Sequence, residues 1–354
     1  RWALSLMGIV VMMSVLLGIS AAESNATGNT TVFPARGEVL VTDLAMGARC
    51  AVAADFDGDG RMDLVSASSN DNAVSWHQNL GKDESGMIRF SIKKKITWSS
   101  LGSRIVTVAD IDGDGLIDVV GASYYDSTVR WFKNLGYDKD KVVFLGFEPN
   151  VISQAVNEGQ GVAVADLDND GDVDIATASS GDNTIAVFTN IDRGTFCDIK
   201  HVVDNNATGA RTVVAADLDG DGYLDLASAS KDDSTVAWYP NKGSEDPAVF
   251  EQKIIISQGS DSTGAYSLVA ADIDKDGNMD LVVASNGNDR VTLWRNVDGK
   301  GKGIRLWVNR KERYLTAAKA EASRRKESMD DKHGWLLMTP AELHGAADTA
   351  TGKP

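Results

Sequence analysis

The chain has 354 residues, with 51 acidic and 35 basic side chains and a formal net charge of −16. A surface this acidic argues against a nucleic-acid partner, which would need a basic face. The two cysteines, Cys50 and Cys197, stand in dissimilar contexts, so we expect separate thiols rather than a disulfide.

The N-terminal residues 1–22 have the pattern of a secretory signal peptide. A basic Arg1 precedes an uncharged apolar stretch at 3–19 and small residues at 20–22. This stretch is short for a membrane span, and an uncleaved anchor is the alternative. We therefore expect a secreted, extracellular protein, with membrane contact only if the segment is an anchor. Because the chain begins with Arg rather than Met, we expect its start to be incomplete.

A polar segment at 23–32 follows, and it contains two Asn-x-Ser/Thr sequons. A third sequon lies much further along the chain. The predicted glycosylation acceptors are Asn25, Asn29 and Asn206.

Five copies of a nine-residue acidic loop, DxDxDGxxD, then recur along the chain. Aspartate occupies positions one, three, five and nine of each copy, and glycine occupies position six. These aspartates are Asp55, Asp57, Asp59 and Asp63; Asp110, Asp112, Asp114 and Asp118; Asp166, Asp168, Asp170 and Asp174; Asp217, Asp219, Asp221 and Asp225; and Asp272, Asp274, Asp276 and Asp280. Position seven varies, and its residues are Arg61, Leu116, Asp172, Tyr223 and Asn278.

The loop pattern predicts about five calcium sites. Four carboxylates so close together repel one another unless a cation joins them, and Ca²⁺ accepts six to eight oxygen ligands at loose geometry. Glycine permits the sharp turn, after which the backbone carbonyl of position seven is free to coordinate. An EF-hand would need a glutamate at position 12 and flanking helices, which are missing here. Solvated turns are the alternative, but they explain one copy better than five.

Successive first aspartates lie 55, 56, 51 and 55 residues apart, a period typical of propellers. We expect one strand before each loop (51–54 in the first unit), one after it, and a third ending at an asparagine 16 residues beyond the ninth position. These asparagines are Asn79, Asn134, Asn190, Asn241 and Asn296. A fourth strand is expected to start near Phe33, Phe90, Phe147, Phe196 and Phe250. The predicted fold is an all-β β-propeller of four-stranded blades with at least five units.

Large apolar side chains recur on one face of the third strand. Two positions carry them: Val74, Val129, Ile185, Val236 and Val291, and then Trp76, Trp131, Val187, Trp238 and Leu293. The aromatic members are either a sugar-stacking ring or, as we favour, core fillers between sheets.

The ends of the array are harder to interpret. Residues 33–41 precede the first loop, and we expect them to form an outer strand that pairs with the last unit. Residues 303–308 resemble a sixth outer strand, so the chain is either a five-bladed ring or a shortened version of a larger one. The propeller is predicted over 33–308. We expect the charged residues 309–354 to be a helical or disordered tail.

The repeated loops resemble the FG-GAP or VCBS-like repeats found in the integrin α head, over residues 33–308. The resemblance implies that the aspartates above bind calcium between the first and second strands of each blade. It also implies that partners dock on the opposite rim. The usual number of units is seven, and the five found here leave the ring size open.

We expect the metal to be structural rather than catalytic. A site that activates water needs an open coordination position and a nearby base. The four histidines, His77, His201, His333 and His344, are scattered without ligand spacing. No catalytic residue is predicted.

The opposite rim holds the candidate ligand site. Six residues before the first aspartates stand Arg49, Arg104, Gln160, Arg211 and Tyr266, which should approach the central axis. The three arginines suit an anionic sugar or a carboxylate. The alternative is that they pair with rim acids such as Asp71, Asp126 and Asp232.

Two functions from different classes follow. The favoured one is a secreted calcium-binding interaction module for adhesion, with an extracellular protein or glycan ligand. The alternative is an extracellular propeller enzyme acting on polysaccharides, a lyase or hydrolase, which needs an acid and a base converging on the rim.

Overall fold

The computed structural model describes residues 39–97, 100–138, 143–243, 248–297, 299 and 304–307. The predicted signal peptide, the sequons at Asn25 and Asn29, and the predicted tail lie outside these residues. The described residues up to Leu306 belong to one compact unit. No helix long enough and apolar enough to cross a membrane is present in this part of the chain.

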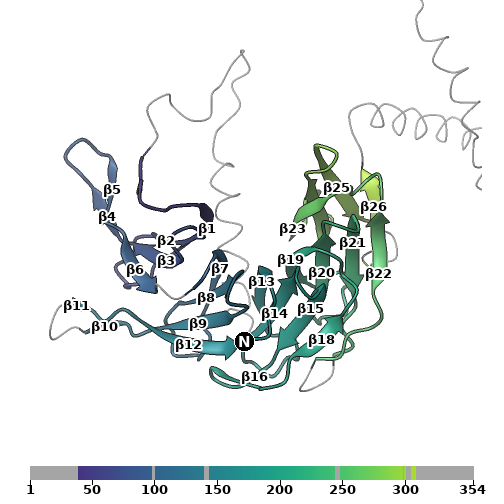
Figure 1. Ribbon diagram of the computed structural model, residues 1–354, viewed down its shortest axis with the longest axis horizontal. Coiled ribbons are helices and arrows are strands. Elements are labelled where there is room, and N and C mark those ends of the chain that lie inside the picture. The colour runs from purple at the N-terminus through teal and green to yellow at the C-terminus, as the bar shows by residue number, and fades with distance from the viewer. Residues whose placement is uncertain are drawn as a thin grey trace, which may run out of the picture. The chain divides into compact units, whose positions relative to one another are not determined.

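The described chain is all β, and its main feature is five four-stranded antiparallel sheets (Figure 1). The first strands are β1 (Ala48–Ala54), β7 (Ser103–Ala109), β13 (Gly159–Ala165), β19 (Ala210–Ala216) and β23 (Ala265–Ala271). The second strands are β2 (Asp63–Ser68), β8 (Asp118–Ser123), β14 (Asp174–Ser179), β20 (Asp225–Ser230) and β24 (Asp280–Ser285). The third strands are β3 (Ala73–His77), β9 (Val129–Asn134), β15 (Thr184–Phe188), β21 (Thr235–Tyr239) and β25 (Arg290–Asn296). The fourth strands are β6 (Lys94–Thr97), β12 (Phe147–Ser153), β18 (His201–Asp204), β22 (Ile254–Gln258) and β26 (Ile304–Trp307).

Each sheet is built from strands that follow one another along the chain, in the order first, second, third, fourth. In three of the units, the chain between the third and fourth strands forms an additional two-stranded ribbon. These ribbons are β4 (Asn79–Lys82) with β5 (Ile88–Phe90), β10 (Tyr137–Asp138) with β11 (Val143–Phe144), and β16 (Asn190–Asp192) with β17 (Thr195–Phe196). The first ribbon projects from its sheet in Figure 1.

The outer strand expected at 303–308 is confirmed as β26, but it is the fourth strand of the fifth sheet and not a sixth outer strand. Of the outer strand expected at 33–41, the structure describes only residues 39–41, which form no strand. A sheet made of consecutive strands needs no strand from the N-terminal segment to complete it.

The fourth strand was predicted to start near an aromatic residue, and among the described members of this set only Phe147 is the first residue of that strand. Phe90 and Phe196 instead end a ribbon strand, and Phe250 forms an isolated bridge with Asn241. The fourth strands of these units begin four or five residues later. The physical reason is packing: Phe196 contacts the core between the second and third sheets, so it lies at the boundary of its sheet with the preceding one.

The cores lie between successive sheets, four in all within the described residues. Phe56 and Trp76 of the first sheet, for example, pack with Val106 and Phe132 of the second. The second strands are covered on both faces, which explains their small alternating residues: β8, β14 and β20 are buried at every position. The predicted core role of the tryptophans is confirmed, because Trp76, Trp131 and Trp238 are all buried.

One face of the fifth sheet differs from its counterparts. Val74, Val129, Ile185 and Val236 are each 0 % exposed, whereas Val291 at the same position is 76 % exposed. Ile273, at loop position two, is likewise 47 % exposed, although its counterpart Phe56 is 1 % exposed. Among the described residues, therefore, no further sheet covers this apolar face.

Candidate functional site

The five acidic loops connect the first strand of each sheet to the second. The predicted turn at position six is confirmed, because its glycine has a positive φ in every copy, for example 83° at Gly60. The glycine N–H donates to the position-one carboxylate, at 2.8 Å from Gly60 to Asp55 Oδ2. The N–H of position seven donates to the position-five carboxylate, at 2.9 Å from Leu116 to Asp114 Oδ1. The loops thus fold back on their own carboxylates.

Three carboxylates converge in each loop, with oxygens within 4.8 Å of one another. Positions one and three take part in all five copies. The third member is position five in the first and fifth loops, and position nine in the others. The groups are Asp55, Asp57 and Asp59; Asp110, Asp112 and Asp118; Asp166, Asp168 and Asp174; Asp217, Asp219 and Asp225; and Asp272, Asp274 and Asp276. In the fourth loop, Asp219 Oδ1 is buried without a hydrogen-bond donor. A ligand set made only of carboxylate oxygens, one of them buried without a hydrogen-bond donor, fits a hard divalent cation such as Ca²⁺.

The aspartate at position nine also has a structural role that the sequence reasoning did not assign. Asp118 is 0 % exposed, and its Oδ1 accepts a hydrogen bond of 2.7 Å from the backbone N–H of Asn134. Its Oδ2 accepts another, of 3.0 Å, from the N–H of Ile111. Burial raises the pKa of this carboxyl to about 6 despite both hydrogen bonds. The side chain therefore joins the loop to the end of the third strand.

The asparagine at the end of the third strand links one sheet to the next. The Nδ2 of Asn134 donates to the carbonyl of Phe56 in the preceding loop, at 2.8 Å, and to its own Ile117, at 3.0 Å. The equivalent bonds between sheets run from Asn190 to Ile111, Asn241 to Leu167 and Asn296 to Leu218. The constant 16-residue spacing was the sequence signal for this role, but spacing alone does not identify a partner in another repeat.

The predicted rim residues lie on five β-bulges. Each rim residue lies in a first strand, at the point where the pairing of that strand with the second strand shifts register. For Arg104, the shift falls between Ser103 and Ile105. The same irregularity surrounds Arg49, Gln160, Arg211 and Tyr266. Bulges redirect side chains and are frequent near functional sites. Sequence periodicity gave no sign of them.

Three arginines gather at this rim. Burial lowers the pKa of Arg104, and the positive charges of Arg49 and Arg211 lower it further. The Arg104 guanidinium lies 4.4 Å from the ring centroid of Tyr124, and that of Arg211 lies 5.0 Å from Tyr266. These contacts bring cationic and aromatic groups from four sheets to one end of the first strands. We call Arg49, Arg104 and Arg211 the arginine cluster.

Neutral groups, rather than acids, hold the arginine cluster. Arg211 Nη1 donates to Gln160 Oε1 at 2.9 Å, and its buried Nε has no hydrogen-bond partner. Arg49 Nε donates to Ser69 Oγ at 3.1 Å. Within the described residues, the cluster forms no ion pair with a carboxylate.

The alternative that these arginines pair with rim acids is therefore wrong. Asp71 pairs with Lys93 instead, and Asp126 pairs with Arg130 at 2.9 Å. Asp232, the third acid named in the alternative, forms no ion pair with the arginine cluster within the described residues either.

Comparison with protein families identifies the repeat. The FG-GAP-like repeat model matches residues 55–121, 110–177, 166–228 and 217–283, in windows that each run from one acidic loop to the strand after the next. The chain belongs to the FG-GAP-like repeat family. The four overlapping windows include all five loops, and each window joins parts of two successive sheets. A four-stranded sheet together with its acidic turn is called one repeat of this FG-GAP-like array. A search of curated proteins found no match.

Several solved structures are similar to these FG-GAP-like repeats. An Agrocybe aegerita lectin, whose title describes recognition of non-reducing terminal N-acetylglucosamine, matches at 21 % identity and a TM-score of 0.51, over 75 % of this chain and 67 % of the lectin. This similarity indicates a shared fold alone. An auxiliary nutrient binding protein from Bacteroides ovatus has 11 % identity and a TM-score of 0.44, over 75 % of this chain and 58 % of its own. Rhamnogalacturonan lyase YesW has 15 % identity and a TM-score of 0.37, over 72 % and 46 %. The last two scores are too low to inform function.

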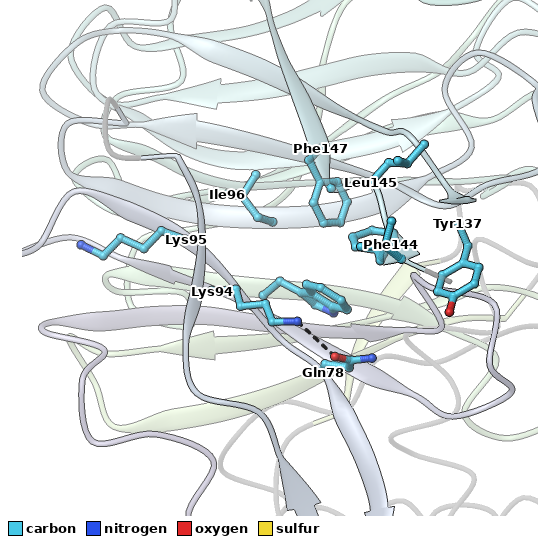
Figure 2. Close-up of a pocket in the computed structure, with 11 residues that line it drawn as sticks. Gln78, Lys94, Lys95, Ile96, Tyr137, Phe144, Leu145 and Phe147 are labelled. Carbon is cyan, nitrogen blue, oxygen red and sulfur yellow. Dashed lines mark hydrogen bonds between the residues drawn. The ribbon is translucent and has the colours of Figure 1, made fainter. Parts of the chain in front are cut away.

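A separate cleft of about 540 Å³ lies between the first two FG-GAP-like repeats (Figure 2). Its walls include Trp76, Phe144 and Lys94, and the lysine ammonium lies 4.4 Å from the Trp76 ring centroid. Figure 2 shows that ammonium directed toward Gln78, whose Oε1 accepts its hydrogen bond at 3.1 Å. The Nε2 of Gln78 in turn donates to Asp57 at 2.6 Å. Two polar groups of the cleft, Lys94 and Gln78, therefore form a chain of hydrogen bonds to the first loop.

The remaining predicted residues are placed as follows. Asn206, the described sequon, is exposed near the start of the fourth FG-GAP-like repeat, and its glycosylation stays a prediction. Cys50 and Cys197 are free thiols, as expected. The Cys50 thiol donates to the carbonyl of Val106 at 3.4 Å, and burial raises its pKa.

Proposed function

We propose that this FG-GAP-like repeat protein is a secreted, calcium-stabilised binding module whose ligand is an anionic extracellular glycan or protein. The observation that carries the proposal is the arginine cluster, because three guanidinium groups gather without a carboxylate partner in the described residues. Like charges held close together cost free energy, which an anionic ligand would recover. Secretion rests on the signal-peptide pattern of residues 1–22.

The acidic loops are proposed to hold structural calcium. The carboxylates at positions one, three, five and nine and the carbonyl of position seven would supply the ligands. When bound, the ion would neutralise the crowded carboxylates and hold the turn between the first two strands. The loops would then keep the five first strands, and hence the arginine cluster, in register.

The chemistry of the rim favours an acidic saccharide. Guanidinium groups bind carboxylates and sulfates through paired hydrogen bonds, and aromatic rings pack against the apolar faces of sugars. Tyr124 and Tyr266 lie beside Arg104 and Arg211, so both kinds of contact are available at one rim. The buried Nε of Arg211 is a donor that such a ligand would satisfy.

A polysaccharide lyase or hydrolase is the second candidate. It would require an acid and a base beside the bound sugar. Glu158 interacts with Tyr124 at the same rim, and this pair supplies the titratable groups to examine. The Tyr124 pKa is raised, by burial first and by Glu158 next, which disfavours the tyrosine as a base at neutral pH.

A glycan array that includes sulfated, uronic-acid and neutral saccharides, run in millimolar calcium, tests the proposal. We expect retention on acidic glycans that weakens as salt increases. Each bound glycan is then incubated with the protein and its products are analysed. Binding without turnover supports the module. Release of unsaturated or shortened sugars establishes the enzyme instead, and binding to neutral glycans alone contradicts the anionic ligand.

A further inference from the structure

The residue immediately before the linking asparagine differs in charge between repeats. It stands 15 positions after the ninth loop residue and lies near the loop of its own sheet. The five residues are Gln78, Lys133, Thr189, Pro240 and Arg295. Two sheets, the second and the fifth, therefore place a cationic side chain where the first, third and fourth place an uncharged one.

Both cations contact the carboxylates at loop positions three and five. In the second sheet, the ammonium of Lys133 forms an ion pair with Asp112 and lies 3.2 Å from Asp114 Oδ2. The side chain of Asp112 is only 8 % exposed and that of Lys133 is 32 % exposed, so this pair is partly shielded from water. A shielded pair is stronger and less sensitive to salt than a surface pair.

The fifth sheet repeats this arrangement with a different cation. Arg295 Nη2 forms an ion pair with Asp274 and lies 3.4 Å from Asp276 Oδ2. Lysine and arginine thus reach the same two loop positions from the same strand position in two separate repeats. The repetition indicates that the strand geometry, and not one accidental rotamer, directs this side chain to the loop.

The fourth loop provides the contrast. Pro240 carries no charge at the equivalent position, and Asp219 Oδ1 is buried without a hydrogen-bond donor. Lys242 lies close enough to influence this loop, but its ammonium pairs with Glu251 on the exposed surface. The carboxylates of the fourth loop are therefore free of a direct cationic partner among the described residues.

The first loop is intermediate. Gln78 reaches Asp57 with a neutral amide N–H at 2.6 Å, and the cation at this loop is Arg61, which pairs with Asp59 from within the loop. Gln78 shows that a neutral donor can make the same contact with position three without bringing a charge. It therefore supplies the natural substitution for a test.

We propose that Lys133 and Arg295 are built-in counter-ions that make the second and fifth loops weak calcium sites, so that the fourth loop fills at lower calcium. This inference rests on the calcium binding proposed above. A divalent ion entering the second or fifth loop must displace the side-chain cation or bind beside its charge, and either course costs free energy. Calcium entering the fourth loop does not have to displace a side-chain cation, so its binding does not carry this free-energy cost. In low calcium, each of the two cations would also offset part of the negative charge of its loop.

Calcium binding to the full chain, measured by equilibrium dialysis with radioactive calcium, tests this inference. We expect the wild-type protein to show at least two affinity classes. In the double variant Lys133→Gln and Arg295→Gln, two weak sites should tighten by about tenfold, because each loses one competing charge. The matched control, Lys133→Arg with Arg295→Lys, retains both charges and should bind like the wild type. The reverse substitution, Gln78→Lys, should weaken one site.

Identical binding curves for the wild type and the double glutamine variant would overturn the inference while leaving calcium binding intact. An equal effect in the charge-retaining control would also overturn it, since the cause would then be packing. If no variant binds calcium, both this inference and the proposed calcium sites are wrong. Thermal melting of each variant in chelator confirms that it is folded before binding is compared.

Discussion

The side-chain amide of Asn134 donates a hydrogen bond of 2.8 Å to the backbone carbonyl of Phe56, which lies 78 residues earlier in the chain. The bond joins the end of one third strand to the acidic loop of the preceding sheet. Because Asn134 is anchored by Asp118, the ninth residue of its own loop, and because equivalent asparagines follow, each of the first four acidic loops is tied to the next sheet. The loops are therefore part of the connection between repeats.

We predict that Asn134→Ala destabilises the protein more than Asn79→Ala does. Both asparagines donate to a carbonyl of their own repeat, but only Asn134 also bonds to a preceding sheet. Losing that buried bond should cost about 1 to 3 kcal/mol more. Urea denaturation of the two variants measures the difference. Equal losses of stability would contradict the linking role.

The stability of the first repeat should depend on His77 at mildly acidic pH. Burial lowers the pKa of His77 from its ordinary value of 6.5, with a further contribution from the Lys93 charge. Below pH 6.5 the unfolded chain binds a proton that the folded imidazole resists, so stability decreases as pH falls through the interval between the two pKa values. The raised pKa of Asp118 changes stability in the opposite direction over the same range, so the histidine contribution is measured as the difference in denaturation midpoint between the wild type and a His77 variant at pH 7.5, 6.5 and 5.5.

The substitution His77→Tyr provides the control. Tyr239 occupies the equivalent position in the fourth sheet and bonds to Ser228 at 3.0 Å, just as His77 bonds to Ser66 at 2.9 Å. The variant should keep the hydrogen bond and lose the histidine contribution to the pH dependence. An unchanged pH profile in this variant would show that the effect arises elsewhere.

Chelation should lower the melting temperature if the loops hold structural calcium. At roughly 0.1 mM affinity in about 1 mM calcium, one site contributes about 1.4 kcal/mol, and five contribute at most about 7. For a folded unit of this size, that corresponds to roughly 10 to 20 °C. Differential scanning fluorimetry with and without chelator measures the shift, and added calcium should restore it. A melting curve that ignores both treatments would refute structural calcium.

The repetition of the sequence explains which features could be predicted from it. The acidic turn, the strands on either side and the buried tryptophans recur at fixed spacing, and a recurring pattern reports a recurring environment. Trp76 and Trp238 are accordingly core residues. The fourth strands lie in the segments of variable length, where Phe90 and Phe196 end ribbon strands instead of starting fourth strands. Phe196 packs against the core between its sheet and the preceding one, a contact that leaves no local sequence signal.

Contacts between repeats could not be predicted from the sequence, for a related reason. A fixed position indicates that Arg104 and Arg211 share an environment, but not that their charges influence each other, nor that bulges redirect both side chains. Similarly, the position of Lys133 gave no indication of its ion pair with Asp112. Such relationships depend on how sheets are stacked and on which rotamers the packing permits.

Binding of polyanions to arginine variants tests the central claim most directly. Surface plasmon resonance on immobilised heparin and polygalacturonate, in calcium, compares the wild type with Arg104→Gln combined with Arg211→Gln. The control combines Arg89→Gln with Arg290→Gln, which removes the same charge from exposed ion pairs elsewhere. We predict that the wild type and the control bind at least one polyanion and that the cluster variant loses about tenfold or more in affinity. Equal binding by all three proteins, or binding by none, would contradict an anion site at the arginine cluster.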